Sequence, residues 1–517
     1  MPVNSVHPDF KKFLPKWERC RDVSDGQDAV HEAGERYLPK LKDQQAADYK
    51  NYVKRATFYN ATWRTIAGLT GMLFRKPPKI EVPDAITELL KDVDSAGQPF
   101  QLFLQDVSEN ALKYGRVGVL VDYPTAPEGI TQADAVTLNL RPTMQIYNTF
   151  AIINWQTGRV ANQTVLVQVV LKEQKWVAKD EYTGAFEDRW RVLDLVDAKA
   201  DASGAAGKRY RQRVYKMAQG QAVAKNATVT FVQEGSDIFP KMGNVPLDHI
   251  PFVIIGSDTT NADVDEPPLI DLVDMNLSHY RTSADYAHGC HFTGLPTLFL
   301  SGFRKENPGD KIYIGSESAI VSSSPDAKAS YVEFTGKGLE SLEKKLDREE
   351  QQMAILGARM LEPQRRGVEA PETAAIHRKG EESMLSSVAQ ALSLAMTIQV
   401  KRFTDWAGVD SSKVLIDINR DFYPAPMTPQ MLTALLAGWQ QGAPGLSDQG
   451  LFDQLKAGEI VPEDADLEDE QARIAEQQQK ISDMNAASQA AAQVDANLTN
   501  KGGNPQGGGA ADGTTGP

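Results

Sequence analysis

The stretch GLESLEKKLDREEQQMAILGARML, residues 338–361, decides how the rest of the chain is interpreted. Its large apolar residues recur at spacings of three, four, seven, three and four, a heptad pattern along one side of a helix. Glu349 occupies the one polar position of this seam, and the other faces are mostly charged. The pattern predicts a helix that packs either inside its own subunit or between neighbouring copies of the chain. The seam residues are Leu339, Leu342, Leu346, Met353, Leu356 and Met360.

Two further long helices and a group of short strands surround this stretch. Upstream, Pro267-Pro268 precedes a predicted helix from Leu269 to about Cys290. Downstream, another helix is predicted from Glu372 to Trp406. The sequence thus predicts a strand-rich insert between two long helices. The insert has candidate strands at 297–300, 311–314, 319–322 and 331–334.

The N-terminal part predicts helices that lead into a sheet. Apolar residues at helical spacing predict one helix from about Gln45 to Phe74. A second helix is predicted over Phe100 to Tyr114, ending at Gly115, and a buried strand follows from Val117. Before them, residues 1–42 are expected to be irregular, because four prolines interrupt any long helix: Pro2, Pro8, Pro15 and Pro39.

The middle of the chain predicts a meander of hairpins, and the C-terminal part predicts helices. Thr428 and Ser447 are expected to cap two short helices, Pro429 to Gln441 and Asp448 to Ala457. From about 484 onwards the residues are small and polar, which predicts a disordered tail. The fold class expected from the whole pattern is α+β. The meander strands are expected at 144–147, 165–171, 175–179, 190–195, 210–216 and 229–233.

Composition narrows the class of protein. The chain has 517 residues, of which 41% are hydrophobic and 24% charged, an ordinary composition for a protein with two or three cores. No apolar run approaches the ~18 residues needed to cross a membrane, and no signal peptide is visible at the N-terminus. The two cysteines, Cys20 and Cys290, lie far apart, as expected in a reducing cytoplasm.

The charge is acidic overall but unevenly distributed. The net charge is −14, whereas residues 1–80 carry fifteen Lys and Arg against nine Asp and Glu. Residues 447–517 carry four against thirteen. A protein that binds nucleic acid tightly usually presents a basic surface, so this balance predicts weak contact with DNA or none. An acidic wall would let a duplex slide, but an ordinary enzyme can carry the same charge.

No motif for catalysis is found. The chain has no phosphate-binding loop, no dinucleotide-binding glycine pattern, no nucleophile elbow and no zinc-protease motif. The acidic pairs Asp271 with Asp274 and Glu349 with Glu350 are interpreted as solvated helix faces rather than as metal ligands. A cluster of histidines near Cys290 lacks a second ligand pair, so no metal site or cofactor is predicted. That cluster comprises His279, His288, Cys290 and His291.

Four stretches in a fixed order resemble the portal proteins of tailed bacteriophages, and in particular a subfamily known mainly as a domain of unknown function in phage genomes. Each is weak alone, and together they extend from about residue 45 to about 475. The first comprises 52–60 and 65–78, and the second comprises 112–124 with Ile152-Ile-Asn-Trp155. The third is 267–286. The fourth comprises 332–336, 357–362 and 372–374.

The resemblance implies a portal-like fold with a β-rich wing, a two-helix stem, a small strand-rich clip and a helical C-terminal crown. A tunnel loop would follow the second stem helix, and a long wing helix with a return strand would follow the loop. The implied parts are an arm (1–44), the wing (45–266), the first stem helix (267–290), the clip (291–336), the second stem helix (337–361), the tunnel loop (362–371), the wing helix and return strand (372–427), the crown (428–483) and the disordered tail (484–517).

The resemblance also implies a function without catalysis. The chain would form a homo-oligomeric ring at one capsid vertex, expected to be a dodecamer, although the sequence does not determine the copy number. Double-stranded DNA would pass through its channel during packaging and ejection. The large terminase subunit, the major capsid and scaffolding proteins and head–tail adaptors would bind it. The ring would assemble in the host cytoplasm, reside in the virion and contact no membrane.

Arg365 and Arg366 are the candidate DNA-contacting residues of the channel. They are adjacent cations beside Gly367, in the segment that the resemblance assigns to the tunnel loop. The alternative is that both pair with acidic neighbours such as Glu362 or Glu369 and never meet DNA.

Two other classes of protein compete with this interpretation. The first is another structural phage protein, such as a head–tail adaptor or a minor capsid protein. Adaptors are usually much shorter than 517 residues, which counts against this alternative. A DNA-packaging enzyme such as a terminase is the second, but it needs a phosphate loop and acidic metal ligands that the sequence lacks. Hydrolysis of ATP by the purified chain alone would favour the enzyme.

Overall fold

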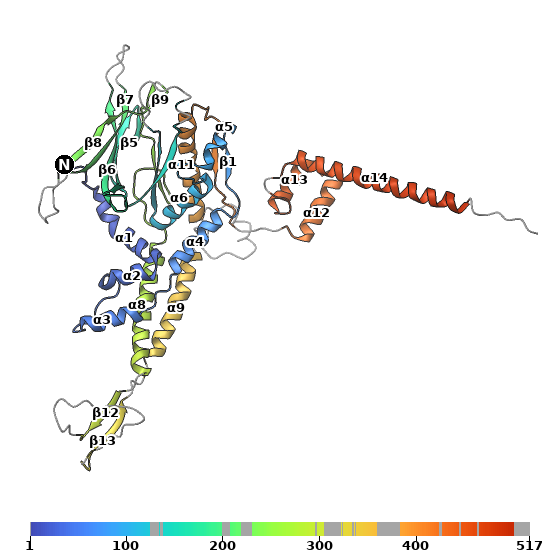
Figure 1. The fold of residues 1–517 in the computed structure, drawn as a ribbon. Helices are drawn as coiled ribbons and strands as arrows, with labels where there is room; N and C mark the ends of the chain where they lie inside the picture. The colour runs from blue at the N-terminus through green and yellow to red at the C-terminus, as the bar shows by residue number, and fades with distance from the viewer. Residues whose placement is uncertain are drawn as a thin grey trace, which may run out of the picture. The chain divides into compact units, whose positions relative to one another are not determined.

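The computed structural model describes most of the chain in two compact units, one within residues 1–422 and one within 423–517. The fold is of the mixed α+β class, as predicted (Figure 1). The described residues are 2–124, 134, 138–198, 207–218, 230–243, 245–294, 297–303, 322, 324–332, 336, 338–358, 383–422, 427–443, 446–462 and 465–500.

The N-terminal segment is helical, and the prediction of an irregular arm over 1–42 was wrong. Helix α1 (Pro8–Asp25) begins with Pro8 at its first positions, where a missing N–H is harmless, and continues through Pro15. Its apolar face is buried, and Trp17, fully buried, donates from Nε1 to the Tyr114 carbonyl at 3.1 Å. Burial of this face therefore outweighs the hydrogen bond lost at Pro15. Helix α2 (Gln27–Ala33) and the short turn η1 (Gly34–Arg36) follow.

The single helix predicted over residues 45–74 is instead two helices, α3 (Ala46–Arg55) and α4 (Ala61–Leu73). Ala56 adopts an extended conformation, and Asn60 starts α4 by accepting a hydrogen bond from the Trp63 amide. The break turns Phe58 into the core against Tyr280, with ring centroids 5.8 Å apart. The helical spacing of apolar residues continues across the break, so the sequence pattern did not reveal it.

Helix α6 (Phe100–Tyr114) ends as predicted at Gly115, which has a φ of 68°. Strand β2 (Arg116–Asp122) follows it and is the middle strand of a three-stranded antiparallel sheet with β3 (Thr143–Asn148) and β11 (Phe252–Gly256). Gly118 is required in β2, because a Cβ there would lie 2.2 Å from the Phe252 ring. Two short elements precede α6, namely α5 (Asp84–Thr87) and η2 (Leu89–Lys91).

The predicted meander is a five-stranded antiparallel sheet in sequential order, β4 to β8. Three details differ from the prediction. The candidate at 144–147 is β3, which belongs to the three-stranded sheet and not to the meander. The candidates at 165–171 and 175–179 are one continuous strand, and the first strand, β4, was not in the predicted set. The strands are β4 (Ile152–Val160), β5 (Gln163–Ala178), β6 (Gly184–Asp197), β7 (Lys208–Met217) and β8 (Phe231–Ile238). A small pair follows, β9 (Lys241–Met242) with β10 (Val245–Pro246).

Two long helices then lie side by side, with a hairpin between them in sequence (Figure 1). They are α8 (Ile270–Gly294) and α9 (Leu339–Ala358), close to their predicted bounds. The hairpin pairs β12 (Thr297–Ser301) with β13 (Lys328–Val332). The predicted strand 311–314 and nearly all of 319–322 lie outside the described residues.

Helix α11 (Met384–Trp406) packs against the three-stranded sheet and α6. It corresponds to the later part of the helix predicted from Glu372, since residues 372–382 lie outside the described ranges. Strand β14 (Leu415–Asp417) then pairs with β1 (Lys79–Glu81). The first unit thus joins both ends of its sequence in one core.

The second unit contains helices α12 (Pro429–Gln440), α13 (Asp448–Ala457) and α14 (Leu467–Asn500). Thr428 and Ser447 cap the first two, as predicted. The disorder predicted from residue 484 was wrong as far as Asn500, because α14 continues to that residue. Alanine and glutamine favour helix without any packing, so a segment with little to bury can still be helical. None of the helices in the described ranges is long and apolar enough to cross a membrane.

Candidate functional site

The pair α8 and α9 is the part of the first unit that the sequence singled out, and we call it the stem. Three contacts define its antiparallel register. Ser278 Oγ donates to Glu349 Oε1 at 2.6 Å, and Lys345 Nζ donates to Thr282 Oγ1 at 2.8 Å. At Gly289 the helices approach so closely that a Cβ would lie 2.5 Å from Leu339 Cδ2. The described stem residues therefore fit together at one register.

The heptad seam of α9 faces α8 in the same chain. Met353 is buried, and Leu339, Leu342, Leu346 and Leu356 are half-buried. Met360, the last seam residue, lies outside the described residues. The packing inside the chain, one of the two predicted alternatives, is therefore present. The described structure holds one chain, so contact between copies remains a prediction.

Glu349, the polar position of the seam, is buried at 5% exposure. Its Oε1 accepts from Ser278, and Lys345 Nζ lies 3.6 Å from the same oxygen. Its Oε2 is enclosed and has no hydrogen-bond partner among the described residues. A buried, half-paired carboxylate costs stability but specifies one register of two helices.

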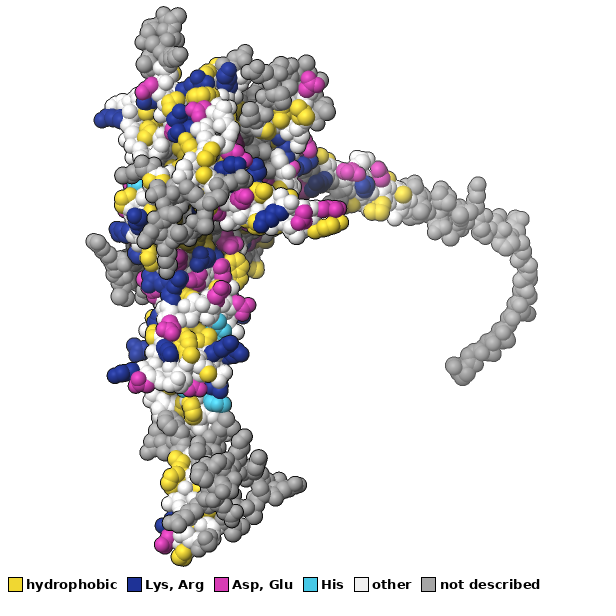
Figure 2. All heavy atoms as spheres, turned by 60° about the vertical axis from the view of Figure 1, so that its left-hand side comes forward, with side chains coloured by type: hydrophobic (Ala, Val, Ile, Leu, Met, Phe, Trp, Pro, Cys, Tyr) yellow, Lys and Arg dark blue, Asp and Glu magenta, His cyan; other side chains and the backbone are white. Residues whose placement is uncertain are grey.

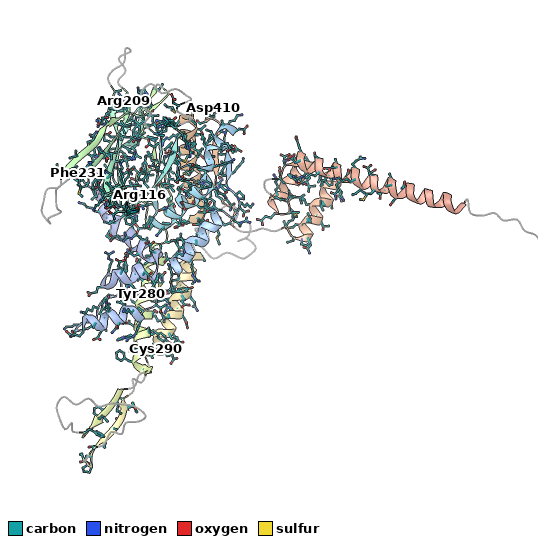
Figure 3. The ribbon with its side chains drawn as sticks, in the orientation of Figure 1. Arg116, Arg209, Phe231, Tyr280, Cys290 and Asp410 are labelled. Carbon is teal, nitrogen blue, oxygen red and sulfur yellow. The ribbon has the colours of Figure 1, made fainter. Side chains whose placement is uncertain are left out.

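The N-terminal segment holds the first half of α8 in place. Asn276 is fully buried, and its Oδ1 accepts from both the amide and the hydroxyl of Thr62, while its Nδ2 donates to the Tyr59 carbonyl. Arg281 Nε donates to the Tyr37 carbonyl at 2.8 Å. The stem is thus attached through hydrogen bonds that an isolated helix pair would lack. Figure 3 shows Tyr280 in this part of the stem and Cys290 farther along α8.

Helix α3 is attached to the same α8 nearer its C-terminal end. Tyr52 donates its hydroxyl to Asp285 Oδ1 at 2.5 Å, and its ring meets His288 edge to face at 5.1 Å. Burial and the adjacent carboxylate raise the pKa of Tyr52 well above its ordinary value. Burial and the positive charge of Arg55 lower the pKa of His288. These groups therefore stay uncharged near neutral pH.

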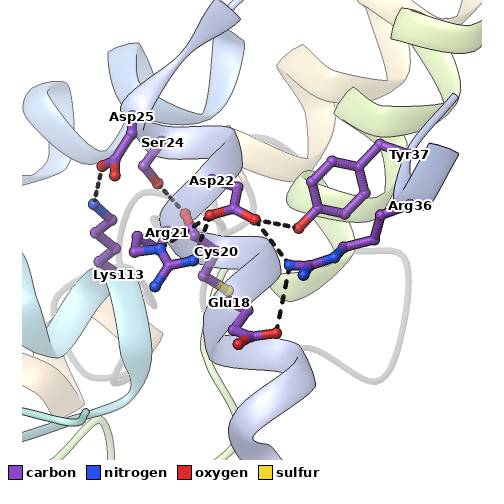
Figure 4. A network of polar contacts seen from close by, with 9 residues as sticks. All are labelled: Glu18, Cys20, Arg21, Asp22, Ser24, Asp25, Arg36, Tyr37 and Lys113. Carbon is purple, nitrogen blue, oxygen red and sulfur yellow. Dashed lines mark hydrogen bonds and ion pairs between the residues drawn. The ribbon is translucent and has the colours of Figure 1, made fainter. Parts of the chain in front are cut away.

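A polar network at the α1 end supports this attachment (Figure 4). Asp22 is buried, accepts the Tyr37 hydroxyl at 2.7 Å and also pairs with Arg21 and Arg36. Burial raises the pKa of the neighbouring Cys20 thiol to about 12, which keeps it unreactive. Sequence reasoning missed this network and Asn276, because only the tertiary fold brings these residues together.

The histidine cluster does not form a metal site in the described part of the chain. Groups of three or more metal-ligating side chains are absent there. His279 Nε2 lies 3.5 Å from Glu350 Oε1, whereas His288 packs on Tyr52 and on Phe292. Of the acidic pairs, Asp274 forms an ion pair with Arg19 at 3.2 Å. The described stem contacts are those of packing and ion pairing.

The candidate DNA-contacting residues Arg365 and Arg366 lie outside the described residues, in the gap between α9 and α11. Their predicted role therefore remains a prediction.

Comparison with known proteins gives a match of one family model to part of the chain and a distant structural likeness. A model of a family described as a domain of unknown function (DUF4055) matches residues 268–407, which comprise the stem, the hairpin and α11. No curated protein matches the sequence.

Among solved structures, the chain resembles one from the neck of a native GTA particle computed with C12 symmetry. The TM-score is 0.35 at 10% identity, over 80% of this chain and 94% of that one. A chain from the neck of an empty GTA particle computed with C6 symmetry gives a TM-score of 0.33 at 12% identity, over 77% and 90%.

Proposed function

We propose that this chain is a portal subunit, which forms a ring at one capsid vertex and surrounds a channel for DNA. The observation that carries the proposal is the stem. Two long antiparallel helices, held at one register, are connected through a segment that contains the hairpin β12–β13. The motifs that resemble portal proteins occur in the same order along the chain.

In the proposed ring, the stem helices lie around the channel and the five-stranded sheet belongs to the wing. A stem suits this position because its packing against α1, α3 and α4 keeps it rigid while DNA moves. The ring would contain copies of this chain alone. When one surface of a subunit fits a different surface of the next copy, repetition of that contact can close into a ring with cyclic symmetry. We expect twelve copies.

The proposed partners bind at different parts of the ring. Terminase and the head–tail adaptors would dock on it from outside the capsid, and the major capsid and scaffolding proteins would surround it. We expect no enzymatic activity from the chain. Hydrolysis of ATP by the purified chain alone would argue for a packaging enzyme instead.

The proposed contact with DNA is weak and independent of sequence, because the duplex must leave each site as readily as it enters. The net charge of −14 supports weak contact. Arg365 and Arg366 are the residues proposed to touch phosphates. Replacing both with alanine should shorten the packaged genome or weaken its retention in the particle, while rings still assemble. Normal packaging by intact mutant rings would remove the two arginines from the mechanism but not the portal assignment.

Electron microscopy and native mass spectrometry of the purified chain test the proposal directly. The expected result is a closed ring with an open axial channel, formed either spontaneously or together with scaffolding protein. Portal subunits can stay monomeric until assembly, so both conditions are needed. A strictly monomeric chain at micromolar concentration in both conditions would overturn the proposal.

A further inference from the structure

The outer face of α3 is basic and has no partner among the described residues. Tyr52 turns toward α8, so Lys50 and Lys54, two residues before and after it, lie on the opposite face of the helix. Both lysines are exposed, and neither forms an ion pair within the described ranges. In Figure 1, α3 projects from α8 on the side away from α9. Figure 2 brings this side forward and shows Lys and Arg side chains, with Asp and Glu among them, between the larger part of the first unit and the hairpin.

Helix α9 carries an acidic stripe beside its seam. Glu340, Glu343, Asp347 and Glu350 follow one another at spacings of three, four and three, which places them along one flank of the helix. Glu340 pairs with Lys344, and Glu350 pairs with His279. Glu343 and Asp347 are exposed and form no ion pair within the described part of the chain.

The basic face and the acidic stripe lie at the same level along the stem. Helix α3 contacts α8 at Asp285 and His288. The pairs Thr282 with Lys345 and Gly289 with Leu339 place that part of α8 beside residues 340–343 of α9. Asp347 lies about one helical turn farther along α9, as Lys50 and Lys54 lie one turn apart on α3. Rotation about a ring axis parallel to the stem preserves this level. In a ring whose axis is parallel to the stem, the α3 side of one subunit would meet the α9 side of the next at matching height.

We infer that Lys50 and Lys54 of one subunit pair with Glu343 and Asp347 of the next subunit in the ring. The occupant of the basic face is thus a second copy of this chain. The inference rests on the proposed ring and adds to it which two faces join. Such peripheral ion pairs mainly set partner orientation and register, and they weaken as salt screens them.

Charge reversal tests the inference. The variants are Lys50→Glu with Lys54→Glu, and Glu343→Lys with Asp347→Lys. Each variant alone brings like charges together at every interface of a ring. We expect each to need a protein concentration roughly tenfold higher than the wild type for half-assembly. Reversal of Lys11 and Lys413, exposed cations outside the stem, is the matched control and should leave assembly unchanged.

Mixing the two reversed variants gives the decisive result. The reversed α3 face of one variant fits the reversed α9 face of the other, and their unchanged faces also fit. We therefore expect rings in the mixture, with alternating subunits in equal numbers by native mass spectrometry. Rings from either variant alone at the wild-type concentration would overturn the inference, as would failure of the mixture to assemble. Failure of the wild type itself would overturn the proposed ring, and the inference with it.

Discussion

Helices α11 and α9 have similar lengths, 23 and 20 residues, but very different surroundings. Helix α11 buries thirteen side chains, whereas α9 buries two, Glu349 and Met353. One is enclosed by the sheet, α4 and α6, and the other packs mainly on α8. Helix α11 therefore stabilises the fold of the single chain, whereas α9 leaves most of its surface exposed, as the proposed contact between subunits would require.

Replacing Phe403 of α11 with alanine should have the largest effect on stability. The side chain is fully buried, so its loss leaves a cavity and should lower the free energy of unfolding by about 3–5 kcal/mol. Urea denaturation of the monomer measures this. The matched change in α9, Ile355→Ala, removes a side chain that is 53% exposed and should cost less than about 0.5 kcal/mol. Equal losses from both variants would contradict the comparison.

Gln399→Leu should lower the free energy of unfolding by a smaller amount, about 2 kcal/mol. Gln399 is fully buried in α11, and its Nε2 donates to the carbonyls of Val119 and Pro251. Leucine has a similar size but removes both hydrogen bonds. The Pro251 carbonyl still accepts from the Val121 amide, whereas Arg402 loses Gln399 Oε1 as an acceptor. Denaturation of the variant is compared with that of Gln351→Leu in α9, where the side chain is exposed. An unchanged midpoint for Gln399→Leu would show that these hydrogen bonds contribute little.

Glu349→Leu should act in the opposite direction and raise stability by about 1 kcal/mol. Leucine would complete the apolar seam and remove a buried carboxylate whose Oε2 has no partner among the described residues. A higher melting temperature of the monomer is the expected result. If melting instead falls, the hydrogen bond from Ser278 outweighs the cost of burying the carboxylate.

Acid should weaken the attachment of α3 to the stem. Burial and Arg55 hold the pKa of His288 below its ordinary value of 6.5 in the folded chain. His288 therefore binds a proton more readily in the unfolded chain than in the folded chain. Its contribution to the stability of the folded chain is complete above about pH 6.5 and declines as the pH falls. Melting temperature measured between pH 7.5 and 5.5 should fall less in His288→Phe than in the wild type. Identical pH profiles would exclude His288 as a source of the loss of stability in acid.

The smallest effect is expected from the C-terminal end. Deleting residues 485–517 should leave thermal melting nearly unchanged, because the described side chains of α14 around Met484 are exposed. Differential scanning calorimetry of the truncated chain measures this. A melting temperature lower by several degrees would show that the deleted segment packs on the protein.

Local signals in the sequence predicted local structure well. Thr428, Ser447 and Gly115 start or end helices where their side chains or backbone freedom led us to expect it. Pro15 misled the prediction, because a helix breaker can be tolerated when the remaining face is deeply buried. The break between α3 and α4 was hidden for a related reason, since the apolar spacing continues across it.

The amino-acid sequence by itself determined the α+β class, the two stem helices with strands between them, and the apolar seam of α9. These features follow from the spacing of apolar residues and from capping groups within a few positions of one another. Only the tertiary structure decided that Asn276 holds the start of α4, that Glu349 is buried with one oxygen unpaired among the described residues, and that α3 lies level with the acidic stripe. Such pairings join residues far apart in sequence, and no local pattern encodes which distant group a side chain will meet.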